Sequence, residues 1–386
     1  MGMDGEQAAH WSRTAAYFYA FVAIGMVAAS LGPTLPSLAA HAGVQLDAIS
    51  FLFTAHALGY LLGSFLGGRL YDRVAGHPVM AGALGLTILI LVIIPISSML
   101  WLLAATWFLV GMGGGAIDVG GNTLMVWLHG RGVGPYMNGL HFFFGVGSFL
   151  AAIVVAQALS LTGDVNWAFW TLALLLLPVT AWLLRVPSPA STNSRHQAPD
   201  ANPGPGMSSP MAWFVPLVAL LLLFYVGAEA AFGGWIYSYA LAMDLGTEAS
   251  AAYLTSAFWG ALTVGRLLGI PLAARFQPGR ILVADLAGCL ASLAAILLWP
   301  GSLVAIWAGS IGLGLAMASI FPAAITLTEQ RVQVTGKVTG WYLVGASLGA
   351  MTLPWLIGQL FDPVGPQVTM IAILAALLAA LAVLGA

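Results

Sequence analysis

The residues whose types and spacing suit chemistry best are an acid and an amide four positions apart, Asp118 and Asn122. In a helix this spacing puts both side chains on one face, one turn apart. A carboxylate accepts hydrogen bonds from hydroxyl groups, and an amide both donates and accepts. The pair therefore suits a solute with several hydroxyl groups, such as a sugar. The alternative is a structural carboxylate that is paired with an arginine.

Three further polar residues stand in apolar surroundings. Glu229 lies in a glycine-rich stretch that can bend, and Asn138 and His141 share a helical face because they are three residues apart. An ionisable group inside a membrane is costly, so it is a functional candidate by default. We predict that Asp118, Asn138, His141 and Glu229 contact the solute, and that Asp118 and Glu229 couple its movement to an ion. For Glu229, a gating contact in a wet vestibule is the alternative.

Aromatic side chains offer flat faces for the apolar C–H face of a sugar ring. Most Trp residues stand near the ends of apolar stretches, as expected for side chains at membrane surfaces. The exceptions lie inside such stretches, and we predict that they contact the solute: Trp235, Trp259, Trp341 and Tyr342.

A separate group of charged residues is predicted to close the protein without contacting the solute. Gly68-Arg69-Leu70 recurs as Gly265-Arg266-Leu267 at an offset of 197 residues, so Arg266 is expected at the same depth as Arg69. We therefore predict a gating role for Arg266, while a pairing with Asp118 remains the alternative. The complete predicted gating set is Arg69, Asp72, Arg73, Arg266 and Asp285.

The elements that position these residues must be membrane helices. Of 386 residues, 60% are hydrophobic and 6% are charged, far below the roughly 25% of a soluble chain. The mean hydropathy is +0.97. The net charge of -2 gives no basic surface for nucleic acid, and the single Cys289 excludes a disulfide framework and a thiolate metal site. The class of water-soluble proteins is excluded.

Apolar stretches recur along the whole chain, each long enough to cross about 30 Å of hydrocarbon. They predict an all-α integral membrane protein with twelve transmembrane helices in two six-helix bundles. The short polar breaks at 97–98 and 299–302 separate neighbouring helices. The predicted spans are 17–38, 48–71, 78–96, 100–128, 135–161, 167–184, 211–242, 250–274, 281–298, 303–327, 338–361 and 368–384.

Positive charge predicts the orientation of these spans, because cytoplasmic loops retain Lys and Arg. With twelve spans, ten of the eleven Lys and Arg residues fall on one side. We therefore expect both termini in the cytoplasm and a multi-pass protein of the cell (inner) membrane. The chain opens with acids rather than a basic leader, and its first span is too long for a cleaved signal, so we expect this span to be retained.

One long polar segment, 187–210, is rich in Pro, Ser, Asn and Gly and is predicted to be a flexible cytoplasmic linker. It divides an N-terminal bundle, 1–186, from a C-terminal bundle, 211–386. The two parts echo each other, since Gly147 and Gln157 have the same spacing as Gly349 and Gln359. A duplicated six-helix unit is typical of secondary transporters that work by alternating access.

Several segments carry a resemblance to a known family. Residues 68–73, Gly-Arg-Leu-Tyr-Asp-Arg, followed by Gly76, resemble the loop signature between helices 2 and 3 of the major facilitator superfamily, although the Gly is one place late and His77-Pro78 replaces the usual basic pair. Residues 115–122 resemble the fucose permease pattern of an acid four residues before Asn. Residues 31–34 and 225–229 are similar to the sodium-dependent glucose transporter-like members.

This resemblance covers essentially the whole chain and implies the major facilitator fold and ion-coupled sugar transport. One departure concerns coupling, because the fucose permeases also carry an acid in their first helix, whereas span 17–38 has none. Their scheme of proton coupling by two acids therefore does not transfer directly.

We expect a secondary active transporter of a sugar or related polyhydroxylated solute, in symport with a proton or sodium. The alternative is a transporter or exporter of an amphipathic solute, such as a drug or glycolipid, or a non-transporting receptor. We predict no enzymatic activity, no cofactor, no metal site and no nucleic-acid partner, and we expect a monomer in the bilayer. Residues 111–115, Gly-Met-Gly-Gly-Gly, are not a nucleotide loop, because no strand precedes them.

Overall fold

The chain folds into helices that are long and apolar enough to cross a membrane. The computed structural model describes residues 2–189, 211–331 and 336–385. Within these ranges, twelve spans have the required length and composition, which confirms the predicted number. Most of the predicted linker, residues 190–210, lies outside the described residues.

Some spans consist of more than one helical piece, so the helices are numbered by piece. The first half contains α1 (Gly2–Ala42), α2 (Leu46–Ile49), α3 (Phe51–Tyr71), α4 (Gly76–Ile93), α5 (Leu100–His129), α6 (Gly134–Thr162) and α7 (Asn166–Arg185), with short 3-10 turns at Ile94–Ile96 and Gly130–Gly132. The second half contains α8 (Met211–Ala242), α9 (Glu248–Ala273), α10 (Pro278–Leu298), α11 (Leu303–Met317), α12 (Ile320–Glu329), α13 (Gly336–Val364) and α14 (Val368–Gly385).

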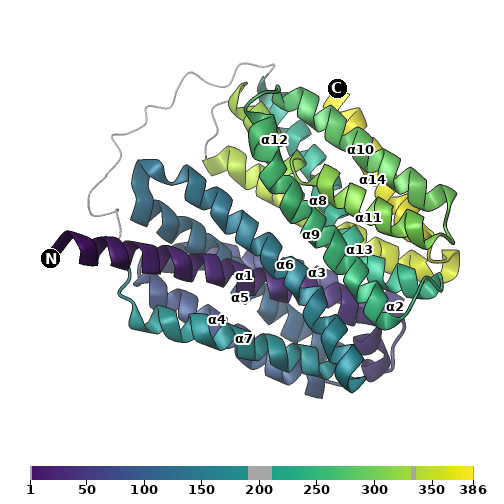
Figure 1. Cartoon of the computed structure of the whole chain (residues 1–386), viewed down its shortest axis with the longest axis horizontal. Helices are drawn as coiled ribbons and strands as arrows, with labels where there is room; N and C mark the ends of the chain where they lie inside the picture. The colour runs from purple at the N-terminus through teal and green to yellow at the C-terminus, as the bar shows by residue number, and fades with distance from the viewer. Residues whose placement is uncertain (1, 190–210, 332–335, 386) are drawn as a thin grey trace.

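The helices form two bundles, α1–α7 and α8–α14, which Figure 1 shows side by side. The bundles are closest near α2 and lie farther apart on the side of the N-terminus and α12 (Figure 1). We call the end near α2 the far end, because it is opposite the end where the chain passes from α7 to α8. We call that opposite end the linker end.

Glycines allow the helices of each bundle to pack backbone against backbone. A Cβ atom on Gly147 of α6 would overlap the backbone of α1 at Val22. In the second half, a Cβ atom on Gly349 of α13 would overlap the backbone of α8 at Leu223. Small residues permit such close approach in membrane helices. The two glycines that echo each other in the sequence therefore occupy matching positions in the two bundles.

One span is interrupted near its middle, where α11 ends at Met317 and α12 begins at Ile320. Pro322 explains the interruption. A proline has no backbone N–H, and its ring clashes with the carbonyl four residues earlier, here that of Ala318. The break consequently leaves Ala318 and Ser319 outside regular helix within the membrane span Leu303–Glu329.

The two bundles are held together at the far end. The Gln359 side chain on α13 donates to the Asp47 carbonyl oxygen at 2.8 Å, and the Thr54 hydroxyl on α3 donates to the Met351 carbonyl oxygen at 3.2 Å. Gly32 on α1 lies against the backbone of Gly233 and Gly234 on α8. These contacts close the far end between the bundles.

Candidate functional site

The predicted acid–amide pair lies on α5 and is held by a residue that the sequence analysis did not identify. The Tyr60 hydroxyl, on α3, donates to Asp118 Oδ2 at 2.6 Å. The Asn122 amide nitrogen donates to Asp118 Oδ1 at 3.1 Å and to the Asp118 carbonyl oxygen at 2.8 Å. Each oxygen of the carboxylate thus has one protein donor and keeps capacity for one more.

This geometry refines the prediction for Asn122. Both of its N–H bonds can be used within α5, so its amide oxygen is what remains to accept a hydrogen bond from a solute. Asp118 and Asn122 together are therefore a set of acceptors. Such a set fits hydroxyl groups, which can each donate a hydrogen bond.

Close packing of α3 against α5 explains why Tyr60 reaches Asp118. A Cβ atom on Gly115 would overlap the Tyr60 carbonyl oxygen, so the two backbones meet at this level. The Ser64 hydroxyl, one turn further along α3, lies 3.4 Å from the Gly115 carbonyl oxygen. The glycine at position 115 thus brings the tyrosine within reach of the acid three residues later.

The predicted pair Asn138 and His141 lies on α6, and both side chains are exposed. The charges of Asp118 and Arg266 both act on His141, so this histidine lies near the acid of one bundle and the arginine of the other. Arg266 donates to the His141 carbonyl oxygen at 3.1 Å. Among the described residues, no ion pair joins Arg266 to Asp118, so Arg266 connects the bundles through backbone instead.

Glu229 has its own tyrosine in the second bundle. The Tyr225 hydroxyl, one turn earlier on α8, donates to the Glu229 carboxylate. The same hydroxyl is 3.0 Å from the Met317 carbonyl oxygen, at the break between α11 and α12. Tyr225 and Glu229 are four residues apart on one helix, so this partner could have been identified from the sequence. Each bundle thus contains one carboxylate that is held by a tyrosine.

The aromatic candidates are not gathered around Asp118. Trp235 is buried at the far end, where its indole N–H donates to the Pro354 carbonyl oxygen at 2.9 Å and its ring stacks on Phe361. Tyr342 is buried, and its hydroxyl is 3.2 Å from that of Thr328. Their predicted solute contacts would require another conformation.

The other two aromatic candidates differ in exposure. Trp259 is 9% exposed and lies against Gly233 of α8, whereas Trp341 is 54% exposed. Of the four aromatics, Trp341 is therefore the most accessible in this conformation.

The predicted gating residues fall in different places. Arg69, Asp72 and Arg73 are exposed at the linker end of α3, where the Arg69 guanidinium lies 4.0 Å above the Phe65 ring. Asp285 lies on α10, which packs on α11, α12 and α14 of its own bundle, and its gating role stays a prediction. Nothing in this conformation places Asp285 at the boundary between the bundles.

Comparison with known proteins agrees with this architecture. Residues 17–354 match the sequence profile of the Major Facilitator Superfamily. The chain belongs to the major facilitator superfamily. A relative from Mus musculus, the sodium-dependent glucose transporter 1A, is 30% identical over 376 residues, which cover 89% of this chain and 88% of that protein. A relative from Rattus norvegicus, the sodium-dependent glucose transporter 1, is 31% identical over 383 residues, covering 91% and 79%.

Solved structures of this superfamily share the fold. The crystal structure of the nucleoside transporter NupG superposes with a TM-score of 0.76 at 13% identity, covering 98% of this chain and 99% of that one. A bacterial homologue of the human lysosomal transporter Spinster gives a TM-score of 0.73 at 13% identity, covering 100% and 97%. This major facilitator protein is therefore a membrane transporter rather than an enzyme, as its sequence predicted.

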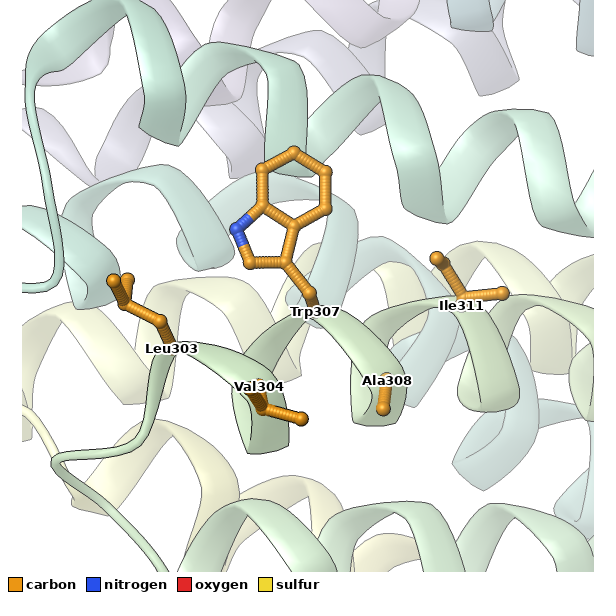
Figure 2. A pocket seen from close by; sticks show the side chains of 5 residues that line it. All are labelled: Leu303, Val304, Trp307, Ala308 and Ile311. Atoms are coloured by element: carbon orange, nitrogen blue, oxygen red, sulfur yellow. The ribbon is translucent and has the colours of Figure 1, made fainter.

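One hollow on the surface differs from the polar site in the chemistry of its lining. It has a volume of about 430 Å³ and is lined only by α11 residues with apolar or indole side chains (Figure 2): Leu303, Val304, Trp307, Ala308 and Ile311. Without carboxylates or amides it offers a polar solute no specific hydrogen bonds. An apolar helix face of this kind suits contact with lipid.

Proposed function

We propose that this transporter carries a sugar or related polyhydroxylated solute by alternating access, in symport with an ion. The observation that carries the proposal is the acceptor set on α5, where Asp118 and Asn122 are positioned by Tyr60. Relatives about 30% identical over most of the chain are named sodium-dependent glucose transporters, which supports the same solute class. The solute would bridge this set and groups of the second bundle.

The two carboxylates held by tyrosines are the proposed coupling groups. Asp118 accepts from Tyr60 in the first bundle, and Glu229 accepts from Tyr225 in the second. A carboxylate that binds a proton or a sodium ion changes its net charge, and the solute hydroxyls then meet a different acceptor. This change makes solute binding depend on the ion, which is the requirement for symport.

The contacts between the bundles support alternating access. The far end is closed by Gln359 and by the approach of Gly32 to α8, whereas Asn138 and His141 are exposed on the linker side of the site. We propose that the linker end faces the cytoplasm, with the bundles bounded at residues 186 and 211. The conformation is then open to the inside, and the transport cycle opens the far end while it closes the linker end.

Uptake into proteoliposomes tests this proposal. Labelled sugars of different hydroxyl stereochemistry are supplied with an imposed proton gradient, with an imposed sodium gradient, or with neither. We expect saturable uptake of at least one sugar and accumulation driven by one of the two gradients. Uptake of amphipathic solutes in place of every sugar would overturn the proposal, as would the absence of any transport.

Variants of the acceptor set sharpen this test. Asp118→Asn keeps the shape of the side chain but cannot bind a proton as a carboxylate does, so gradient-driven accumulation should vanish while solute exchange survives better. The matched control is Asp362→Asn, which makes the same change at an exposed position at the end of α13. Accumulation by Asp118→Asn at the rate of the wild type would remove Asp118 from coupling and leave Glu229 as the candidate.

A further inference from the structure

A second hollow lies at the linker end of the C-terminal bundle, between four helices that pack in a ring. In this ring α8 packs on α12, α12 on α10, α10 on α14, and α14 on α8. The hollow has a volume of about 250 Å³, and residues of all four helices line it. Its lining includes Phe214 and Gly279, near the starts of two membrane spans, and Leu384, near the end of a third. The hollow therefore lies at the level of one membrane surface.

The inner part of this hollow is apolar. Along α8 its lining extends from Phe214 to Leu221, a helical rise of about 10 Å. Leu282 on α10 and Ala324 on α12 line it with buried side chains. The hydrocarbon of one leaflet is about 15 Å thick, so the hollow extends through the outer part of a single leaflet. This depth and this lining suit part of a lipid acyl chain.

A cation lies at the mouth of the hollow. Arg331, just beyond the end of α12, is exposed and belongs to the lining. Its guanidinium carbon lies 5.0 Å from the centre of the Phe214 ring, which lines the same hollow. A guanidinium that stacks on a ring still has its N–H groups at its edge, and their geometry suits phosphate oxygens. In the part of the chain that the structure describes, no acid forms an ion pair with Arg331.

The charges near the mouth favour an anion. Arg280 follows the lining residue Gly279 and is exposed, while Glu329, the last residue of α12, is the acid nearest to Arg331 in the sequence. Basic pockets between membrane helices bind anionic lipid head groups in this way. The hollow on α11 is the contrast, because no charged residue lines it. General contact with lipid needs no cation, whereas selection of an anionic head group does.

We propose that this hollow binds one anionic phospholipid from the leaflet at the linker end. An acyl chain lies between the four helices, and the lipid phosphate accepts hydrogen bonds from Arg331. A phospholipid is favoured over a free phosphate ion because only the lipid fills the apolar part of the hollow. The inference goes beyond the proposed function, since it holds whichever solute the protein carries.

Native mass spectrometry of the purified protein in detergent measures this binding directly. Phosphatidylglycerol and phosphatidylcholine with the same acyl chains are added in separate titrations. The wild type should bind one phosphatidylglycerol at least about fivefold more tightly than phosphatidylcholine, which is the factor expected for one arginine near a membrane surface. Arg331→Gln should lose this preference. The matched control Arg185→Gln, at the exposed linker end of α7 in the other bundle, should keep it.

The acyl chain has its own test. Leu217→Trp should fill the hollow and weaken the binding of phosphatidylglycerol, because Leu217 belongs to the lining. Leu220→Trp is the matched control, since Leu220 lies on the same helix outside the lining and is 39% exposed. Glycerol phosphate carries the phosphate without a chain, so at the same concentration as the lipid it should not displace phosphatidylglycerol.

Several results would overturn the proposal. They are equal affinities of the wild type for the two lipids, an unchanged preference in Arg331→Gln, equal binding by Leu217→Trp and Leu220→Trp, and displacement by glycerol phosphate. Should Leu217→Trp fail to fold, phosphatidylglycerol with a photoreactive group in its chain replaces that variant. Crosslinks in α8, α10, α12 or α14 would support the site, and crosslinks spread evenly over both bundles would refute it. A failure of sugar transport would leave all these binding measurements unaffected.

Discussion

A single methyl group at the far end should shift the conformational balance of the transporter. A Cβ atom on Gly32 would lie 2.7 Å from the Gly233 carbonyl oxygen and 2.9 Å from the Gly234 Cα atom, whereas ordinary contact begins at 3.4 Å. The bundles must therefore separate by about 0.7 Å along this contact. Because the contacted atoms belong to the backbone of α8, they cannot rotate away.

The cost of this overlap follows from the usual penalty for overpacking, about 1 to 3 kcal/mol. The penalty applies only while the far end is closed, so Gly32→Ala should favour the state that is open at the far end. The ratio of open to closed protein should rise by about fivefold to 150-fold. Gly82→Ala, on α4, is the matched control because nothing lies within 4 Å of its new Cβ atom.

Spin labels provide the assay. Gln45 and Glu248 are exposed at the far end of opposite bundles and are replaced by labelled cysteines, while the native Cys289 is buried. Electron–electron double resonance should show a larger population of long distances in Gly32→Ala than in Gly82→Ala. Equal distance distributions in the two variants would show that the α1–α8 contact does not control the far end, and would refute this reasoning.

Three further changes have defined outcomes. Tyr60→Phe removes the 2.6 Å hydrogen bond to Asp118, and the solute concentration for half-maximal exchange should rise by up to about a hundredfold; an unchanged value would place Tyr60 outside the site. Gln359→Ala removes contacts that close the far end, so the same spin-label pair should report about fivefold to thirtyfold more protein that is open at the far end. An unchanged population would show that Gln359 does not hold the far end closed. Cysteines at Ser194 and Gln367 should react with impermeant reagents from opposite sides of the membrane, and labelling from one side would contradict the proposed orientation.

The number of membrane helices was predictable for two reasons. The backbone of each span must form its hydrogen bonds within that span, and apolar side chains must cover the fixed thickness of the membrane. The ends of the helices were less predictable. α1 extends over Gly2–Ala42, whereas its apolar part suggested 17–38. A helix continues past the membrane surface when its residues tolerate helical geometry, and hydropathy does not report this extension.

Polar contacts between residues close in sequence were predictable, whereas contacts between residues far apart in sequence were not. Asp118 and Asn122 were predictable because four residues of helix place them together, and Tyr225 with Glu229 follows the same rule. The contact of Tyr60 with Asp118 spans 58 residues and depends on how closely two helices approach. No spacing in the sequence encodes it, although the glycines that permit the approach are visible there.

The gating role expected for Asp285 stays a prediction. Its place on a membrane helix was predictable from hydropathy, whereas the packing of α10 on α11, α12 and α14 is a property of the folded bundle that no spacing in the sequence encodes.

The glycine contacts within each bundle have a mechanical consequence. Where backbone touches backbone, as at Gly147 with α1 and Gly349 with α8, the seam has no side chains that can change rotamer and absorb a displacement. Such seams are stiff, so a force at the acceptor set cannot dissipate locally as side-chain rearrangement. The displacement must instead appear as rotation of a whole bundle about the contacts between the bundles. Replacing these glycines with residues that have flexible side chains should then uncouple solute binding from opening of the far end, while the binding groups stay unchanged.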